Sequence, residues 1–235
     1  MILTYHAIEQ GPPPLFIAAD LFRRHVETIA DSPAVVVSLD DVLVGDLPEH
    51  WVALTFDDAY ASVVRNAGPV LSDAGFAATI FSVAGRIGAD NRWTGQPQSV
   101  PSRPLATAEE LSELAAAGWA IGSHGMEHTA LDASRMLERE VVESRALLQR
   151  ATGTAVDWFA YPYGSVGGGD LVASTYRGAV AMGNGVADAE SPEYALPRVD
   201  AHYLRRPALL ARALAGGHGY VALRRSLARL TKLRG

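Results

Sequence analysis

Val52-Ala53-Leu54-Thr55-Phe56-Asp57-Asp58 is the stretch that decides the fold, because two adjacent carboxylates follow five residues typical of a buried β-strand. A strand of this composition is apolar on both faces, so we expect helices to cover it and loops to gather at its end. Carboxylates in such a place need a cation, a proton or a metal. An Asp that caps the next helix would explain one of the two carboxylates but explains both poorly.

Short apolar runs alternate with helical patterns along the chain, with the spacing of βα units. Between the runs, Thr107 and Glu110 form a capping-box pattern before a helix that Gly118 should end. At 235 residues and without a linker-like stretch, the sequence predicts one α/β domain. The strand candidates are residues 2–5, 35–39, 52–56, 77–83, 119–123 and 158–161.

The stretch from Gly85 to Pro104 is rich in Gly, Pro, Asn and Ser and predicts a long loop. Loops of this length in compact domains are usually functional or disordered. Trp93 within it favours a functional loop, and a Trp packed against its own loop is the alternative.

Residues 205–235 carry eight Lys or Arg and no Asp or Glu. The rest of the chain then holds 12 basic and 26 acidic side chains, a net charge of −14. This acidic body argues against nucleic acid as a partner. From Leu223 to Arg234, leucines and basic residues predict a basic amphipathic helix. We expect it to pack on the body with its basic face solvated; contact with an anionic membrane surface or a partner protein is the alternative.

Four of the strand candidates end in residues that can bind a metal or transfer a proton. In barrels of parallel strands the C-terminal ends converge on one face, where catalytic groups gather from distant parts of the sequence. These endings are therefore expected to share one pocket. They are Tyr5-His6, Asp57-Asp58, Ser123-His124 and Tyr161-Pro162-Tyr163.

His124 and His128 stand four residues apart, so one turn of helix or a tight loop would bring both imidazoles to the same side. Two exposed loop histidines are the alternative. Two histidines and one aspartate together form the ligand set that leaves zinc an open fourth position. Because adjacent side chains of an extended backbone point in different directions, we expect one aspartate on the metal and the other acting as general base.

A cation near the base would hold it ionised, and Arg198 is a candidate. A surface salt bridge is the alternative for this arginine.

At these residues the sequence resembles the polysaccharide deacetylases, the metal-dependent carbohydrate esterases that share the NodB homology domain. The resemblance covers most of residues 1–204 and rests on several ordered motifs. It implies a distorted (β/α) barrel over residues 1–204, with 205–235 as a basic helical segment packed on it or appended. The motifs are Thr55-Phe56-Asp57-Asp58, Gly122-Ser123-His124-Gly125-Met126-Glu127-His128, Phe159-Ala160-Tyr161-Pro162-Tyr163-Gly164 and Leu196-Pro197-Arg198.

The resemblance also implies removal of an acetyl group from an amino sugar. Asp58, His124 and His128 would bind one divalent metal, with Zn²⁺ first and Co²⁺, Ni²⁺ or Fe²⁺ as alternatives. Asp57 would be the general base, and the backbone N–H of Tyr163 would stabilise the oxyanion.

The side chains expected to contact the substrate are Trp93, Tyr161 and Pro162.

The general acid distinguishes two branches of the family. Many members carry this histidine in a late motif, whereas a circularly permuted branch carries it at the N-terminus. Tyr5-His6 resembles the permuted branch, and its place at the end of the first predicted strand favours the same choice. His202 is the rival, because it stands where an unpermuted member would place its late histidine.

Three residues depart from the family pattern. Ala59 stands where Gly is usual, so a positive φ there would cost energy. Gly125 replaces the usual Ser or Thr and removes a hydroxyl that could bond within the motif. Ala160 stands where many members have the Arg that orients the base, which favours Arg198 for that role.

The leading hypothesis is an N-deacetylase acting on an N-acetylglucosamine-like sugar in a glycan, a glycolipid precursor or a small glycoconjugate. The alternatives are a metal-dependent hydrolase of another C–N amide or an O-acetyl ester, and a carbohydrate-binding protein with a vestigial site. No apolar run approaches the roughly 20 residues of a membrane-spanning helix, and the first six residues lack a signal-peptide pattern. We therefore expect a cytoplasmic protein, with membrane-peripheral attachment as the alternative.

Overall fold

The computed structural model describes residues 1–132, 134–183 and 185–223. Within them, seven parallel strands close into a barrel in the order β1-β8-β7-β6-β5-β4-β3, and β3 pairs back onto β1. An eighth short strand, β2, pairs in parallel with the first two residues of β3. The strands are β1 (Ile2–Tyr5), β2 (Val35–Val36), β3 (Trp51–Phe56), β4 (Thr79–Ser82), β5 (Ala120–Ser123), β6 (Trp158–Ala160), β7 (Gly178–Met182) and β8 (Leu196–Asp200).

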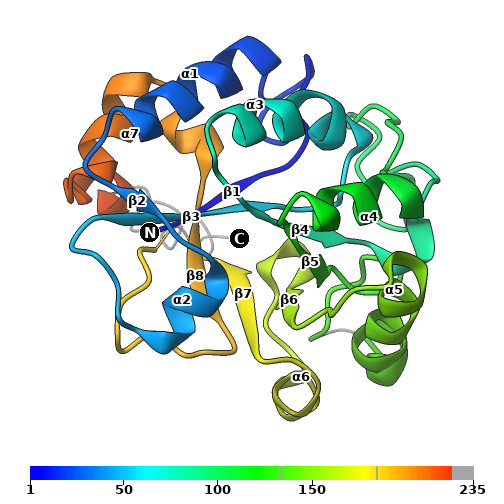
Figure 1. Cartoon of the computed structure of the whole chain (residues 1–235). Helices are drawn as coiled ribbons and strands as arrows, with labels where there is room; N and C mark the ends of the chain where they lie inside the picture. Colours follow the sequence, from blue (N-terminus) through cyan, green and yellow to red (C-terminus); the bar gives the residue numbers. More distant parts are fainter. Residues whose placement is uncertain (133, 184, 224–235) are drawn as a thin grey trace.

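Helices surround this barrel, as Figure 1 shows in a view that looks into the ring of strands. The expected (β/α) barrel in a single domain is thus confirmed. Its α-helices are α1 (Ala19–Ala30), α2 (Leu39–Val44), α3 (Gly68–Asp73), α4 (Ala108–Ala116), α5 (Ser144–Thr152), α6 (Gly169–Thr175) and α7 (Pro207–Leu214). Shorter helical segments are the π-helices η1 (Val63–Ala67) and η3 (Arg139–Glu143) and the 3₁₀ turns η2 (Ala84–Arg86), η4 (Pro162–Gly164) and η5 (Ala201–Leu204).

The strand side chains divide between two apolar layers, because successive residues of a strand point to opposite faces. One layer lies between the barrel and the helices and includes Leu3, Leu54 and Phe56. The other includes Ile2 and Ala53 and belongs to the opposite face of the same strands. Odd-numbered residues near the end of β3, such as Ala53 and Thr55, therefore point to the barrel interior.

Local sequence signals explain where several elements begin and end. Thr107 and Glu110 form the expected capping box of α4, and Gly118 follows its end with a φ of 92°. The predicted strand at 35–39 is shorter than expected: only Val35–Val36 pairs, because Ser38 caps α2 in a second capping box. The side chain of Ser38 accepts a hydrogen bond from the backbone N–H of Asp41, which turns the chain into a helix.

Two strands of the barrel were missing from the sequence prediction. β7 has the sequence Gly-Ala-Val-Ala-Met, whose small residues give a weak strand pattern. Gly178 is small for a packing reason, because a Cβ there would lie 2.6 Å from the Trp158 ring. β8 contains Pro197, which normally argues against a central strand.

The basic C-terminal segment is described only in part. α7 packs against α1. The predicted amphipathic helix from Leu223 to Arg234 lies almost wholly outside the described residues, so its role and the boundary at 204/205 stay predictions. In the described part of the chain, the search for a helix long and apolar enough to cross a membrane found none.

Helix α1 contributes a fully buried histidine to the outer layer. His25 Nδ1 lies 3.1 Å from the hydroxyl of Tyr5, and its Nε2 lies 3.4 Å from the carbonyl oxygen of Arg205. Burial lowers the pKa of His25 to about 4, and the contact with the Arg205 carbonyl only partly opposes this. In the folded state the imidazole of His25 is therefore neutral at neutral pH.

This burial predicts an acid-sensitive fold. Between pH 6.5 and about 4 the unfolded chain protonates His25 while the folded chain does not, so the free energy of unfolding should fall as the pH falls through this window. The contribution of this single group is about 3 kcal/mol. Urea unfolding of the metal-free protein at pH 4.5, 5.5 and 7 should give a shallower pH slope for His25→Gln than for the parent. His50→Gln, which removes a half-buried histidine, is the control, and equal slopes for all three proteins would contradict the prediction.

Candidate active site

The C-terminal ends of the barrel strands surround a cavity of about 550 Å³. His6 follows β1, Asp57 and Asp58 follow β3, and His124 follows β5, so chain segments far apart in sequence meet there. Of the ten residues proposed from the sequence, eight line this cavity. The eight are His6, Asp57, Asp58, Trp93, His124, His128, Tyr161 and Tyr163; Arg198 lies beneath it, and Pro162 is buried outside its lining.

Asp57 is held by a buried bidentate pair with Arg198. The guanidinium donates to Asp57 Oδ1 at 2.7 Å and to Oδ2 at 2.6 Å, and a further bond of 3.2 Å reaches the hydroxyl of Thr55. Arg198 is 0% exposed, which excludes the surface salt bridge considered as its alternative. Because Thr55 and Asp57 are two residues apart, both point to the barrel interior, where Arg198 reaches them across β1.

The electrostatics of this pair keep Asp57 ionised. Burial alone would raise the pKa of this carboxyl. The Arg198 guanidinium, with smaller contributions from His124 and His6, outweighs burial and holds the pKa of Asp57 well below its usual range. The result is a buried carboxylate that stays unprotonated at neutral pH.

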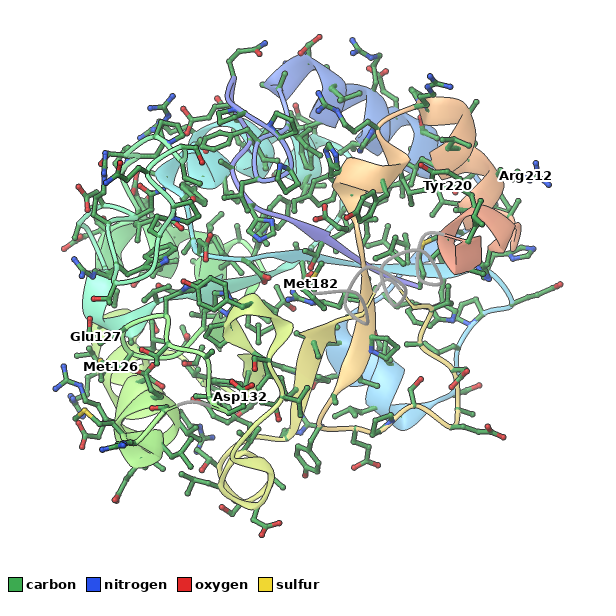
Figure 2. All side chains as sticks on the ribbon, turned by 180° about the vertical axis from the view of Figure 1, so that it is seen from behind. Met126, Glu127, Asp132, Met182, Arg212 and Tyr220 are labelled. Carbon is green, nitrogen blue, oxygen red and sulfur yellow. The ribbon has the colours of Figure 1, made fainter. Side chains whose placement is uncertain are left out.

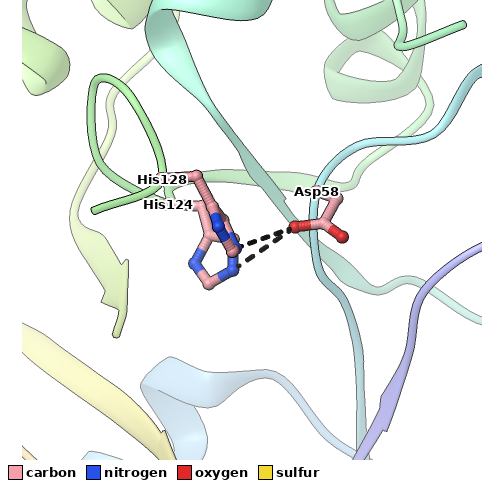
Figure 3. A group of neighbouring side chains, drawn as sticks. All are labelled: Asp58, His124 and His128. Atoms are coloured by element: carbon pink, nitrogen blue, oxygen red, sulfur yellow. Dashed lines mark ion pairs between the residues drawn. The ribbon is translucent and has the colours of Figure 1, made fainter. Parts of the chain in front are cut away.

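Asp58 differs from Asp57 in its partners: Asp57 faces Arg198, whereas Asp58 faces His124 and His128. Figure 3 shows its carboxylate directed at both imidazoles, with Oδ1 3.6 Å from His124 Nε2 and 3.3 Å from His128 Nε2. One ligand atom from each of the three residues lies within 4.8 Å of the others, and all three residues are buried. These are the ligand types and the number that zinc uses in catalytic sites.

The protonation states also suit a metal. Burial lowers the pKa of His124 to about 4, which leaves a neutral imidazole, and its Nδ1 lies 2.7 Å from the carbonyl oxygen of Ala160. That contact fixes the tautomer with a free Nε2, as is usual for a metal-binding histidine. Asp58 Oδ1 is buried without a hydrogen-bond partner in the described part of the chain. A carboxylate oxygen that lies beside two imidazole nitrogens and has no hydrogen-bond partner fits a divalent cation.

Unusual backbone conformations concentrate at this site. The described residues include four non-glycine residues with positive φ: Asp58 (66°), Ala59 (53°), His128 (57°) and Tyr163 (57°). The predicted cost at Ala59 is thus present. Such strain at a cluster of polar side chains is typical of functional sites, where it re-aims side chains. The change of conformation at Asp58 turns its carboxylate away from that of Asp57.

His6 also lies close to Asp57, with its Nε2 4.0 Å from Asp57 Oδ2. Asp200, at the end of β8, also lines the cavity and is 8% exposed. Burial raises the pKa of Asp200, and His6 is the first of the groups that oppose this rise. The rival His202 is not among the cavity-lining residues; its backbone N–H donates to Asp200 Oδ1 at 2.8 Å.

Two aromatic rings enclose His128. The Trp93 ring lies nearly parallel to the imidazole, with ring centroids 4.3 Å apart and 30° between the planes. The Tyr163 ring meets the same imidazole edge-on, with centroids 4.5 Å apart. The predicted long loop thus places Trp93, which is 5% exposed, against a candidate metal ligand.

Sequence reasoning missed several parts of the cavity wall. Asp200 stands two residues after Arg198 on β8, so both side chains lie on the same face of the strand. A prediction of β8 would therefore have indicated Asp200 as a neighbour of Arg198 in the site. Met182, labelled near the centre of Figure 2, ends the equally unpredicted β7. The residues Pro12 to Pro14 form another part of the wall, and only their rigidity marks them in the sequence.

The family model of the polysaccharide deacetylases matches residues 44–175. This chain belongs to the polysaccharide deacetylase family. It is accordingly a hydrolytic carbohydrate deacetylase. Deacetylases of this family act on N-acetylated carbohydrates. The match includes Asp57, Asp58, His124, His128 and Tyr163, whereas His6 and Arg198 lie outside it.

Individual proteins resemble this chain in sequence or in fold. The Bacillus subtilis (strain 168) protein YxkH, whose name places it in the same family, is 27% identical over 208 residues, 84% of this chain and 70% of the relative. The fold matches the Streptococcus pyogenes deacetylase PplD with a TM-score of 0.77 at 23% identity, covering 91% of this chain and 96% of the other. It also matches IcaB from Ammonifex degensii with a TM-score of 0.73 at 21% identity, covering 93% and 96% of the two chains.

The pair between Arg198 and Asp57 predicts a specific pH effect. In Arg198→Met, burial is no longer opposed by the guanidinium, so the pKa of Asp57 should rise and the acidic limb of kcat/KM should move to higher pH by about one unit or more. The variant should also lose about 3–5 kcal/mol of stability, because it leaves a buried charge unpaired.

Arg198→Lys is the matched control, because it keeps a positive charge but not the two parallel bonds. Its acidic limb should move less than that of Arg198→Met, and it can be measured alone if the methionine variant does not fold. Acidic limbs at the parental pH in both variants would contradict the role given to Arg198.

Proposed function

We propose that this deacetylase hydrolyses the acetamide of an N-acetylglucosamine-like amino sugar with the help of one divalent metal, Zn²⁺ in the first place. The observation that carries the proposal is the division of two adjacent carboxylates. Arg198 holds Asp57 ionised, while Asp58 faces His124 and His128 in the same cavity.

Asp58, His124 and His128 would hold the metal. A divalent metal there would polarise the acetamide carbonyl and acidify the attacking water. The burial of both histidines, the neutral imidazole of His124 and the Asp58 oxygen without a hydrogen-bond partner support this assignment. Co²⁺, Ni²⁺ and Fe²⁺ accept the same ligand types.

Asp57 is proposed as the general base. It accepts the proton of the attacking water while the oxygen of that water bonds to the acetamide carbon. Arg198 keeps both carboxylate oxygens in place, so the side chain cannot rotate away from the reacting water. The backbone N–H of Tyr163 is proposed to donate to the oxyanion that forms on the former carbonyl oxygen.

His6 is proposed as the general acid. The C–N bond breaks as His6 donates a proton to the leaving nitrogen, which gives acetate and the free amine of the sugar. The position of His6 in the cavity lining, with its Nε2 4.0 Å from Asp57 Oδ2, supports the assignment. Asp200 lines the same cavity.

The cavity walls are proposed to hold the sugar. A volume of about 550 Å³ is within the range of small-molecule sites and suits one or two sugar units at the reacting centre. Trp93 and Tyr161 line the cavity and offer apolar ring faces to the sugar. Pro162 lies outside the lining, and its contribution would be to fix the turn that presents Tyr163.

The proposal predicts that substitution of Asp57 lowers activity without loss of metal, whereas substitution of Asp58 causes loss of the metal. Asp57→Asn should lower kcat for acetate release from N-acetylglucosamine oligomers by about 10²-fold or more, while zinc content stays near one equivalent. Asp58→Asn, its neighbour, should instead lose zinc. The measurements are an acetate assay and metal analysis of the purified proteins. Full acetate release by Asp57→Asn, or loss of zinc from it, would contradict the divided roles.

The general acid can be identified by comparing two histidine variants at equal metal content. His6→Ala should lower kcat by about 10²-fold, because the leaving amine loses its proton donor. His202→Ala should stay close to the parental rate. The assignment is wrong if His202→Ala loses far more turnover than His6→Ala does.

A further inference from the structure

The three residues between His124 and His128 are held by a carboxylate from another element. Glu140 is 3% exposed, and its Oε2 accepts hydrogen bonds from the backbone N–H groups of Met126 (2.8 Å) and Glu127 (3.1 Å). Figure 2 shows Met126 and Glu127 next to each other at the rim of the molecule. We call residues 125–127 the histidine loop.

Three other polar backbone groups of the histidine loop have partners in different directions. The carbonyl oxygens of Gly125 and Met126 accept bonds of 2.9 Å from the N–H groups of Ala84 and Gly85. The N–H of Gly125 donates to Ser123 Oγ at 3.2 Å. Glu140 is therefore the partner of the remaining two donors, and without it the buried N–H of Met126 and the partly buried N–H of Glu127 would both lose their partner.

Gly125 makes room for this carboxylate. A Cβ at position 125 would lie 2.7 Å from Glu140 Oε2, and the φ of +81° favours glycine in any case. The sequence departs here from the Ser or Thr usual in the family. The close approach of Glu140 gives that departure a physical reason.

The carboxylate reaches the loop from an irregular helix. Glu140 lies on the π-helix η3 (Arg139–Glu143), which α5 continues. Single π-turns inside helices often occur at functional sites because they re-aim a side chain. Tyr176 supports η3 from outside the site by donating its hydroxyl to the carbonyl oxygen of Val141 at 2.7 Å.

We propose that Glu140 is a positioning residue that sets the geometry of the two histidine ligands through the backbone of the histidine loop. It does not contact the reacting atoms. The inference rests on the metal site of the proposed function. Removing such a support from metal ligands typically lowers metal affinity 10- to 100-fold.

Three substitutions test which property of Glu140 matters. Glu140→Gln keeps the length and can present its amide oxygen to both N–H groups, so zinc affinity should stay within about fivefold of the parent. Glu140→Asp keeps the charge but is one methylene shorter, and Glu140→Ala removes the acceptor. Both should lose about 10- to 100-fold in zinc affinity, measured by competition with a chromophoric chelator. The visible spectrum of the Co²⁺-loaded proteins should change in the same two variants.

Tyr176→Phe is the matched control, because it removes a buried hydrogen bond to the same π-helix and leaves both bonds from Glu140 to the histidine loop in place. Its melting temperature should fall while zinc affinity and the Co²⁺ spectrum stay parental. If Glu140→Ala does not fold, Glu140→Asp carries the test. Parental zinc affinity in folded Glu140→Asp would overturn the inference, whereas failure of the parent itself to bind zinc would count against the proposed function.

A double-mutant cycle tests the contact between Gly125 and Glu140 directly. Gly125→Ala should weaken zinc binding more in the parent than in the Glu140→Ala background, because the added Cβ meets the carboxylate only when Glu140 is present. Strictly additive losses would contradict the steric part of the inference.

Discussion

A buried guanidinium at the centre of the barrel is the interaction on which the site depends. Arg198 is fully buried and binds both oxygens of Asp57, so two charges that would each be costly inside the fold neutralise one another. The pair spans three neighbouring strands, because β1 lies between β3 and β8. It therefore links these strands at the end where the cavity opens, and both oxygens of Asp57 are occupied by the guanidinium.

The second carboxylate is then free for a different task. Asp58 follows at once, but its left-handed backbone turns the side chain towards His124 and His128. The adjacent aspartates thus have different partners: Asp57 pairs with a guanidinium, and Asp58 faces a pair of buried imidazoles. The histidines in turn depend on supports outside the ligand set: the Ala160 carbonyl for His124, the rings of Trp93 and Tyr163 for His128, and Glu140 for the loop between them.

The sequence predicted those parts of the structure whose signals are local. The run before Asp57 has the composition of a buried strand, and Thr107 with Glu110 marks the start of α4. The sequence did not predict β7 and β8. Gly178 in β7 is small because the Trp158 ring leaves no room for a side chain, and Pro197 in β8 breaks the strand pattern. Asp200 was missed together with β8. Glu140 gave no signal at all, since its role arises only when a π-helix brings it to a loop 13 and 14 residues away.

The most direct test of the account is to locate the metal itself. Crystals of the zinc-loaded protein, measured on both sides of the zinc absorption edge, should give one anomalous peak bounded by the Asp58 carboxylate and the Nε2 atoms of His124 and His128. Asp57 should remain paired with Arg198 in the same electron density. A peak coordinated by Asp57, or no peak at this site in protein that contains zinc, would contradict the division of the two carboxylates.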